Sequence, residues 1–499
     1  MIVPSTGKLG RGLVAGAVGT ALLTSVAAAH SLQGPSSSQS PYVVRSQPGV
    51  VSRSILTVGD AVNAKPDGTP YRLVGIPDGL GAYDNGDGTF TLLVNHELPA
   101  GRGAQRAHGA AGAFISKWII EKGSLRVLHG EDLMQRVATW DPATGRYNEP
   151  AKGVELSRLC SADLPQPGAF YDRTSGVGYE GRLLMNGEEK GPEGRAFAHA
   201  LDGTSYELPA LGKASWENLL ANPATGRKTV VVGLDDSGGG QVYIYVGEKQ
   251  ATGNPAERAG LANGVLYGLK IEGLARETDA TVLAGPVPFS LHAFGDVRNW
   301  TGAKLEQESV LHGVTSFQRP EDGAWDPRNP RDFYFVTTAS MEGKSRLWRL
   351  RFVDPANPAA GGTVELLLDG TEGPKMMDNL TITRRGQILI QEDPGNHSRL
   401  AKIWRYDIDS GRLEAVAEHD PNRFAPGAAA FLTQDEESSG IIDASDLLGE
   451  GWFLLTVQAH YKHPDPELVE GGQLLALHVP PGEGPKGPGD DRPGKPGAR

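Results

Sequence analysis

The feature that most restricts the fold of this chain is an apolar stretch that ends in a polar, mostly acidic cluster and that recurs six times. A loop and a second apolar stretch follow each copy, and a polar residue and a turn precede it. The six copies are FTLLVNHE (90–97), RLLMNGEE (182–189), TVVVGLDD (229–236), FYFVTTAS (333–340), QILIQED (387–393) and WFLLTVQAH (452–460). Such repetition is typical of architectures in which each unit packs on its neighbours.

The repeated unit predicts an all-β protein. Short runs of Val, Leu, Ile, Tyr and Phe alternate with Gly, Pro, Asp and Asn turns, and no long helical periodicity stands out. Six strand-turn-strand-loop-strand units predict a six-bladed β-propeller over residues 54–479, with an insertion near 249–317 where the spacing widens. Two stacked β-sandwiches are the alternative.

A propeller would bring the ends of these strands together, because the inner strands of all blades run along one central channel. The strand-end acids are Glu97, Glu188, Glu189, Asp235, Asp236, Glu392 and Asp393. The preceding polar residues are Asp78, Cys160, Glu217, Arg319 with Glu321, Asp378 with Asn379, and Asp443. Carboxylates this close cannot all ionise without cations, and oxygen-rich clusters suit calcium. We therefore expect a metal site in the central channel.

Cys160 is the only cysteine of the chain, so the fold is held without disulfides. A lone thiol is either buried as a small hydrophobic group or held by a metal. Cys160 occupies the position that corresponds to Glu217 and Glu321 in other repeats. This favours a ligand role, and a thiolate among carboxylates indicates a transition metal such as iron or zinc.

The ends of the chain predict an exported protein. Lys8 and Arg11, the apolar run 13–28 and the Ala-rich site after it are typical of a secretory signal over residues 1–29. Residues 30–53 and 480–499 are expected to be a disordered linker and a disordered Pro/Gly-rich tail. A net charge of −12 argues against nucleic acid or an anionic membrane surface as partner. No membrane span is expected after signal cleavage, and we expect a monomer.

Several motifs together resemble one family. They are, in order, LLVNHE (92–97), the LC pair at Cys160, GEE (187–189), WEN (216–218), RPEDGAWDP (319–327), QEDPGN (391–396) and DEESSG (435–440). This ordered set is similar to that of the PhoX-type alkaline phosphatases, from about residue 74 to residue 479.

The resemblance implies an exported, periplasmic or extracellular phosphomonoesterase with a six-bladed propeller and a centre of iron and calcium ions. By this resemblance, Cys160 and Glu217 are iron ligands, and Glu97, Glu321 and Asp393 bind calcium or bridge calcium and iron. Asn95 and Arg319 contact the phosphate of a small-molecule ester. The resemblance gives Glu188 and Glu189 a role as metal ligands or as neighbours of the ligands, and we include Asp235 among the metal candidates.

Other functions remain open at this point. One is a different metal-assisted hydrolase on the same scaffold, such as a calcium-dependent phosphodiesterase, a phytase-like enzyme or a lactonase. Another is a calcium-stabilised propeller that binds a partner without catalysis. Glu436, Glu437 and Asp443 fit a solvated loop somewhat better than channel ligands, and His460 and His463 fit surface and catalytic roles equally.

Overall fold

The computed structural model describes residues 31–482, and almost all regular structure in it is strand. Six four-stranded units can be traced through the sheets. The first two are β6 (Pro77–Asp84), β7 (Thr89–His96), β8 (Phe114–Glu121), β9 (Val127–Asp132), and β13 (Leu159–Asp163), β16 (Leu183–Glu188), β17 (Ala196–Ala200), β18 (Thr204–Glu207). The next two are β19 (Trp216–Ala221), β20 (Lys228–Asp235), β21 (Gly238–Glu248), β22 (Val265–Ile271), and β25 (Pro320–Trp325), β26 (Asp332–Thr337), β27 (Arg346–Phe352), β28 (Gly362–Leu368). The last two are β29 (Met377–Ile382), β30 (Gln387–Glu392), β31 (Lys402–Asp407), β32 (Leu413–His419), and β33 (Glu436–Asp443), β34 (Trp452–Lys462), β35 (Glu470–His478), β3 (Val51–Thr57).

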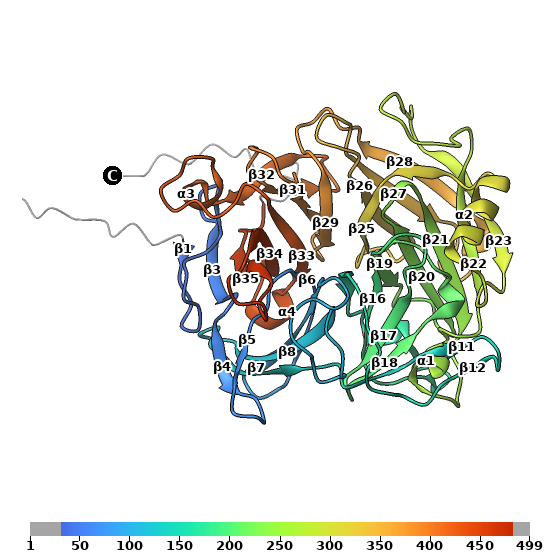
Figure 1. The fold of residues 1–499 in the computed structure, drawn as a ribbon. Helices are drawn as coiled ribbons and strands as arrows, with labels where there is room; N and C mark the ends of the chain where they lie inside the picture. The colour runs from blue at the N-terminus through green and yellow to red at the C-terminus, as the bar shows by residue number, and fades with distance from the viewer. Residues whose placement is uncertain (1–30, 483–499) are drawn as a thin grey trace, which may run out of the picture.

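The first-named strands of these units form a closed ring. β6 contacts β13, and the contacts continue through β19, β25, β29 and β33 back to β6. Figure 1 shows these strands around the centre, with the chain colour advancing from blue to red around the ring. The prediction of an all-β propeller is confirmed.

The second strand of each unit is apolar along its whole length because both of its faces are covered. In β7 and β20, seven of the eight residues are buried in each case. A strand packed between neighbouring sheets has no solvent face, so it lacks the alternation of a half-exposed strand. The DNGDG turn (84–88) between β6 and β7 forms a hairpin, with Gly86 and Gly88 at positive φ.

The stretch 31–53 is folded, so the expectation of a disordered linker is wrong there. β3 pairs antiparallel with β35 and completes the last unit with a strand from the other end of the chain. β1 (Ser31–Leu32) lies along β3, and β2 (Val43–Arg45) adds an edge strand to the unit of β29 to β32. Figure 1 shows this blue segment beside the red β35. Tyr42, Val43 and Val50 are buried. Burial of these apolar side chains stabilises the folded segment although most of its other residues are polar or proline.

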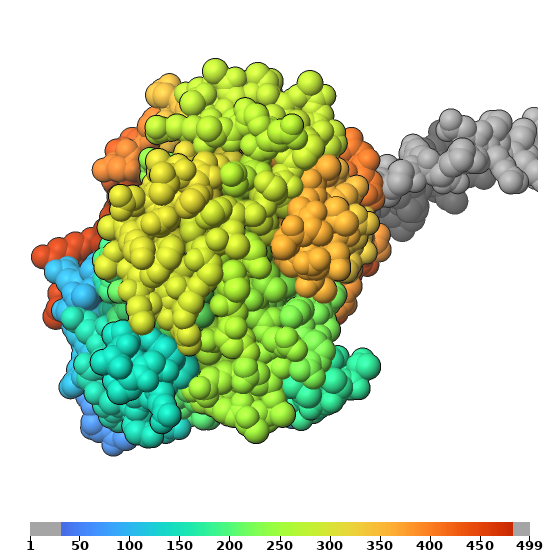
Figure 2. All heavy atoms as spheres, turned by 90° about the vertical axis from the view of Figure 1, so that its right-hand side faces the viewer, coloured from blue at the N-terminus to red at the C-terminus, as the bar shows by residue number. Residues whose placement is uncertain are grey.

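The insertion between the third and fourth units is shorter than predicted. β22 lies inside the range 249–317 but is the outer strand of the third unit. The added segment contains β23 (Val287–Gly295), α2 (Gly302–Leu311) and β24 (Ser316–Gln318). β23 pairs with both β22 and β28, so it joins the outer edges of two neighbouring units. Figure 2 shows this segment in yellow on the outer surface.

Short elements complete the described residues. The strands are β4 (Ala61–Ala64), β5 (Pro70–Arg72), β10 (Arg136–Ala138), β11 (Trp140–Asp141), β12 (Arg146–Tyr147), β14 (Tyr171–Asp172) and β15 (Val177–Gly178). The helices are α1 (Pro255–Arg258), α3 (Pro421–Phe424), α4 (Ser445–Leu448), and the 3₁₀ turns η1 (Pro167–Ala169), η2 (Pro209–Leu211) and η3 (Pro358–Ala360). Within residues 31–482, no helix is both long enough and apolar enough to cross a membrane. The predicted signal at 1–29 and nearly all of the predicted tail lie outside the described residues.

Candidate metal centre

Each innermost strand places one polar side chain at the same level of the channel. The backbone shows the equivalence, because in every unit the N–H of a residue near the end of the second strand donates to a carbonyl just before the first strand. These donor and acceptor pairs are Glu97 to Ile76, Glu189 to Arg158, Asp236 to Ser215, Thr338 to Arg319, Asp393 to Met376 and His460 to Asp435. Two residues after each acceptor come Asp78, Cys160, Glu217, Glu321, Asp378 and Glu437, which we call the inner ring.

The backbone before the inner ring is strained in four of the units. Ile76, Arg158, Arg319 and Met376 all have φ between 45° and 61°, a left-handed conformation that non-glycine residues seldom adopt. Each lies two residues before an inner-ring side chain. The same strain at four equivalent positions fixes how the inner-ring residue enters the channel, and strain of this kind is concentrated at functional sites.

Two groups of side chains lie close enough to share a metal ion. Ligand atoms of Asp78, Glu97 and Cys160 lie within 4.8 Å of one another, and the Cys160 thiol donates to Asp78 at 3.4 Å. Ligand atoms of Glu217, Glu321 and Asp378 lie within 4.8 Å of one another in the same way. Five of these six residues belong to the inner ring, and Glu97, the residue after β7, lies beside it.

Burial makes the ionised forms of these groups unfavourable. It raises the pKa of Asp78, Glu217, Glu321 and Asp378 well above the usual range, and neighbouring carboxylates add to the effect. Burial likewise raises the pKa of the Cys160 thiol, with Glu217 contributing further. Cations held among these groups would restore the ionised forms.

Two strand-end acids belong to the same environment. Burial and the charge of Glu97 raise the pKa of Glu189 to about 9. Burial and the charge of Glu437 raise the pKa of Asp393 to about 8. Glu437 belongs to the inner ring, and the charge of Glu189 helps to raise the pKa of Glu217, so both acids lie beside the inner ring.

Three basic groups border the inner ring. Arg158 bonds Glu97 at 2.7 Å and also pairs with Glu189. His460 Nδ1 lies 2.7 Å from Glu470 Oε2, and its Nε2 lies 3.7 Å from Glu437 Oε2. Although burial opposes it, contact with Glu437 and Glu470 raises the pKa of His460 to about 11.

Arg319 is the third basic group. Its Nε and Nη2 each donate to Asp236 at 2.8 Å, and Nη2 lies 2.9 Å from Glu321 Oε1. The side chain is one-third exposed, although the carboxylates that hold it are buried. Arg319 is therefore a planar cation held at the edge of the second cluster and still accessible.

Of the two roles predicted for Glu188, metal ligand or neighbour of the ligands, the first is not met, because the residue lies outside both clusters. Arg195 donates from Nε at 2.7 Å and from Nη2 at 2.9 Å, the Ser157 amide donates at 3.0 Å, and Lys190 lies at 2.8 Å. These groups occupy both carboxylate oxygens and, although burial opposes it, lower the pKa of Glu188. Glu189, the next residue, faces Arg158 and Glu97 instead.

The unit of β29 to β32 repeats this arrangement. Arg399 donates to Glu392 from Nη2 at 2.6 Å and from Nε at 3.0 Å, and the Trp404 indole donates at 2.9 Å. Glu392 precedes Asp393 as Glu188 precedes Glu189, and in both units the arginine follows its glutamate by seven residues. In each doublet the first acid is fixed within the blade and the second faces the inner ring.

Two further predicted site residues lie elsewhere. Asp235 accepts the amide of Ser215 at 3.1 Å and lines a separate small cavity with Glu306, so it is outside both clusters. Asn95 is fully buried, and its Nδ2 donates to the Leu159 carbonyl at 2.6 Å. Asn95 thus ties β7 to the strand that carries Cys160.

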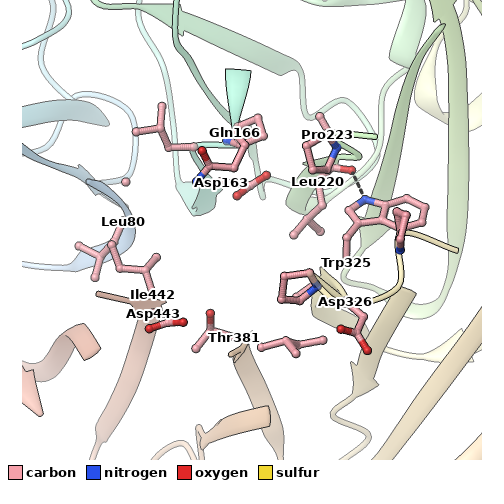
Figure 3. Close-up of a pocket in the computed structure, with 18 of the residues that line it drawn as sticks. Leu80, Asp163, Gln166, Leu220, Pro223, Trp325, Asp326, Thr381, Ile442 and Asp443 are labelled. Atoms are coloured by element: carbon pink, nitrogen blue, oxygen red, sulfur yellow. Dashed lines mark hydrogen bonds between the residues drawn. The ribbon is translucent and has the colours of Figure 1, made fainter. Parts of the chain in front are cut away.

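A polar floor lies one residue further along the inner strands. Asp322 accepts Asn218 Nδ2 at 2.6 Å and the amides of Gly323 and Leu380 at 2.7 and 3.1 Å. Ser161 accepts Asn379 Nδ2 at 3.1 Å. Beyond this floor the opposite mouth of the channel opens into a second cavity, shown in Figure 3. Asp443, predicted to precede the sixth strand end in the channel, lies in that opposite mouth.

Several residues to which the family motifs gave no role lie at the site. Asp78 and Asp378 belong to the clusters, and Asp236 holds Arg319. Glu437, expected in a solvated loop, takes the sixth inner-ring position, and His460 binds it. The sequence signal was present for Asp78 and Asp378, which precede repeats, whereas identifying Glu437 required the register of β33.

Comparison with known proteins finds a matching family model and a solved structure with a similar fold. A sequence model of the family described as "Alkaline phosphatase PhoX" matches residues 198–439. The structure of Pseudomonas fluorescens PhoX in complex with vanadate, a transition state analogue, superposes with a TM-score of 0.63 at 13% identity, covering 86% of this chain and 95% of that chain.

Other solved structures are more distant. Trypanosoma rangeli sialidase has a TM-score of 0.36 at 11% identity, covering 87% of this chain and 60% of its own. The α-L-arabinofuranosidase PaAbf62A from Podospora anserina has a TM-score of 0.29 at 9% identity, covering 85% of this chain and 96% of its own. No curated protein sequence matches significantly. The family model and the shared fold confirm the predicted resemblance to the PhoX-type alkaline phosphatases.

Proposed function

We propose that this protein is an exported metal-dependent phosphatase that hydrolyses phosphate monoesters at the inner ring. The observation that carries the proposal is the pair of buried clusters, Asp78–Glu97–Cys160 and Glu217–Glu321–Asp378, with Arg319 beside the second. The family relationship supports the reaction class, since the matched family is that of alkaline phosphatase PhoX.

The donor set fits the metals that the family implies. The second cluster offers only carboxylate oxygens, which suit calcium. The first adds the Cys160 thiol, which suits a softer metal such as iron. Glu321 Oε1 is buried and pairs with Arg319 Nη2 at 2.9 Å, which leaves a second lone pair of that oxygen for an ion. In this proposal Glu189, Asp393 and Glu437 complete the set around the two clusters.

The metal ions would supply positive charge that offsets the charge of the ester and polarises its phosphoryl oxygens. The chain supplies the orientation. Arg319 presents a planar guanidinium that can bind two phosphate oxygens, while Asp236 fixes its plane. Although burial opposes it, contact with Glu437 and Glu470 raises the pKa of His460, so in the metal-free protein the protonated imidazole pairs with Glu437.

The test is metal analysis and turnover on the same secreted sample, purified without chelators. We expect calcium and iron in the wild type, and hydrolysis of p-nitrophenyl phosphate. Cys160→Ala and Glu217→Gln should lower turnover at least about a hundredfold and reduce the bound metal, because each removes a ligand. Ser161→Ala is the matched control, since its hydroxyl lies in the floor. Metal-loaded protein that hydrolyses no phosphate monoester would contradict the proposal.

A further inference from the structure

The opposite mouth of the channel is a cavity of about 360 Å³ built by all six inner strands. This volume lies within the range of about 300–1,000 Å³ that is typical of small-molecule sites. The walls are mainly apolar and include Leu80, Leu164, Pro223, Trp325 and Ile442. The Trp325 indole is fixed by donating to the Leu220 carbonyl at 3.1 Å, as Figure 3 shows.

The charged side chains of this cavity all have one sign. Asp163, Asp326 and Asp443 line it, and none of its lining residues within the described chain is Lys, Arg or His. Figure 3 shows Asp163 and Asp443 reaching the open centre from different strands. An anionic ligand would be repelled here, and a neutral ligand would leave the acids uncompensated.

The three acids differ in how well they are already paired. Asp326 accepts the amide of Arg328 at 2.8 Å, and Asp443 accepts the amide of Ser445 at 2.9 Å. Burial raises the pKa of Asp163 to about 7, the charge of Asp322 adds to this rise, and the amide of Ala221 opposes it. Asp163 is therefore the acid that gains most from a cation in the cavity.

The cavity is separate from the metal clusters. Asp163 lies three residues beyond Cys160 on β13, roughly 10 Å along the strand. Between them lies the polar floor, in which Asp322 accepts three hydrogen bonds. A ligand of this cavity would not touch the inner ring.

The spacing of the acids argues against a bare metal ion. Among residues 31–482, the groups with three ligand atoms within 4.8 Å are the two clusters described above, and neither contains Asp163, Asp326 or Asp443. Acids too far apart to chelate one ion, set in apolar walls, suit a larger cation. We propose that this mouth binds a small organic ammonium ion, with the charged group at Asp163 and an apolar body against Leu80, Trp325 and Ile442.

The test is titration calorimetry of the full, metal-loaded protein with n-hexylammonium, and with n-hexanol as its uncharged counterpart. We expect saturable binding of one n-hexylammonium per chain and at least about tenfold weaker binding of n-hexanol, because only the cation offsets Asp163. Asp163→Asn should weaken n-hexylammonium at least about tenfold. Asp354→Asn is the matched control, since it removes an exposed acid elsewhere and should leave the affinity unchanged.

A second variant covers the case in which Asp163→Asn fails to fold. Ala82→Leu adds volume from β6 and should also weaken binding while the circular dichroism spectrum stays that of the wild type. Glu217→Gln, at the inner ring, should bind n-hexylammonium as the wild type does. Equal affinity for n-hexanol, no effect of either cavity variant, or loss of binding in Glu217→Gln would each overturn the proposal.

Discussion

At the scale of single residues, Arg319 combines several constraints that a purely structural arginine does not need. It has a positive φ of 61°, its Nε and Nη2 both donate to Asp236, and it stays one-third exposed beside the second cluster. A lysine would keep the charge and lose the planar fork. Replacing Arg319 with lysine therefore tests the geometry of the side chain while its positive charge is kept.

Arg319→Lys should lower kcat/KM for a phosphate monoester about 10²–10³-fold, with most of the loss in kcat, because the two-point contact matters most as charge develops on the phosphoryl group. Steady-state kinetics of the metal-loaded enzyme measure this. Arg328→Lys is the control, since Arg328 also pairs with carboxylates but on the far side of the floor. Wild-type kinetics in Arg319→Lys would reduce Arg319 to a structural partner of Asp236.

At the scale of elements, the two Glu–Arg pairs show how a blade supports its neighbour in the ring. Arg399 neutralises the fully buried Glu392, and this fixes the end of β30 from which Asp393 projects. Arg399→Gln should destabilise the protein by about 3–5 kcal/mol, since it leaves a buried carboxylate unpaired. It should also weaken metal binding about 10–100-fold through the displacement of Asp393. Chemical denaturation and metal titration give the two values.

Arg384→Gln provides the comparison for that experiment. Its partner Asp446 is as exposed as Arg384 itself, so the loss should be at most about 1 kcal/mol, with unchanged metal affinity. If both variants lost the same stability, the buried pair would have no special role. If Arg399→Gln lost stability but kept its metals, the pair would support the blade alone.

The strands also show which parts of the fold and of the site could be predicted from the sequence. The second strands of the units were visible as repeated apolar runs, and the all-β propeller follows from them. Doublets such as Glu188–Glu189 could not be resolved, because the partner Arg195 fixes which acid faces inward. Glu437 was hidden because its position depends on the register of β33, and a shift of one residue would reverse the face of every side chain. The role of residues 31–53 was missed because the pairing partner, β35, is more than 400 residues away.

At the scale of the whole molecule, the concentration of buried acids makes stability depend on pH and metal together. Without metal, burial holds the pKa of Glu189 at about 9 and that of Asp393 at about 8, above the ordinary value of roughly 4. The folded state then binds more protons than the unfolded state, so stability is complete below about pH 4 for these groups and falls as pH rises toward 8 or 9.

We therefore expect the Tm of chelator-treated protein to fall between pH 5 and pH 8, and calcium to restore it at pH 8 by taking the place of the protons. Calcium at a hundredfold its Kd should add about 2.7 kcal/mol per site. Scanning calorimetry at the two pH values, with and without calcium, measures both effects. Glu217→Gln should flatten the pH dependence and shrink the calcium effect, and a pH-independent Tm in the metal-free wild type would contradict this account.

The pairing of β3 with β35 has a consequence for how the protein folds. Strand β3 belongs to the start of the described chain and β35 to its end, so the last blade is incomplete until nearly the whole polypeptide is available. The pairing of β3 with β35 therefore has a high contact order. The entropic cost of closing so long a loop arises before the contacts that offset it can form. The six inner-ring side chains meet only once this closure has happened. We therefore expect the metal ions to bind late in folding. Once bound, they would stabilise the closed ring of inner strands.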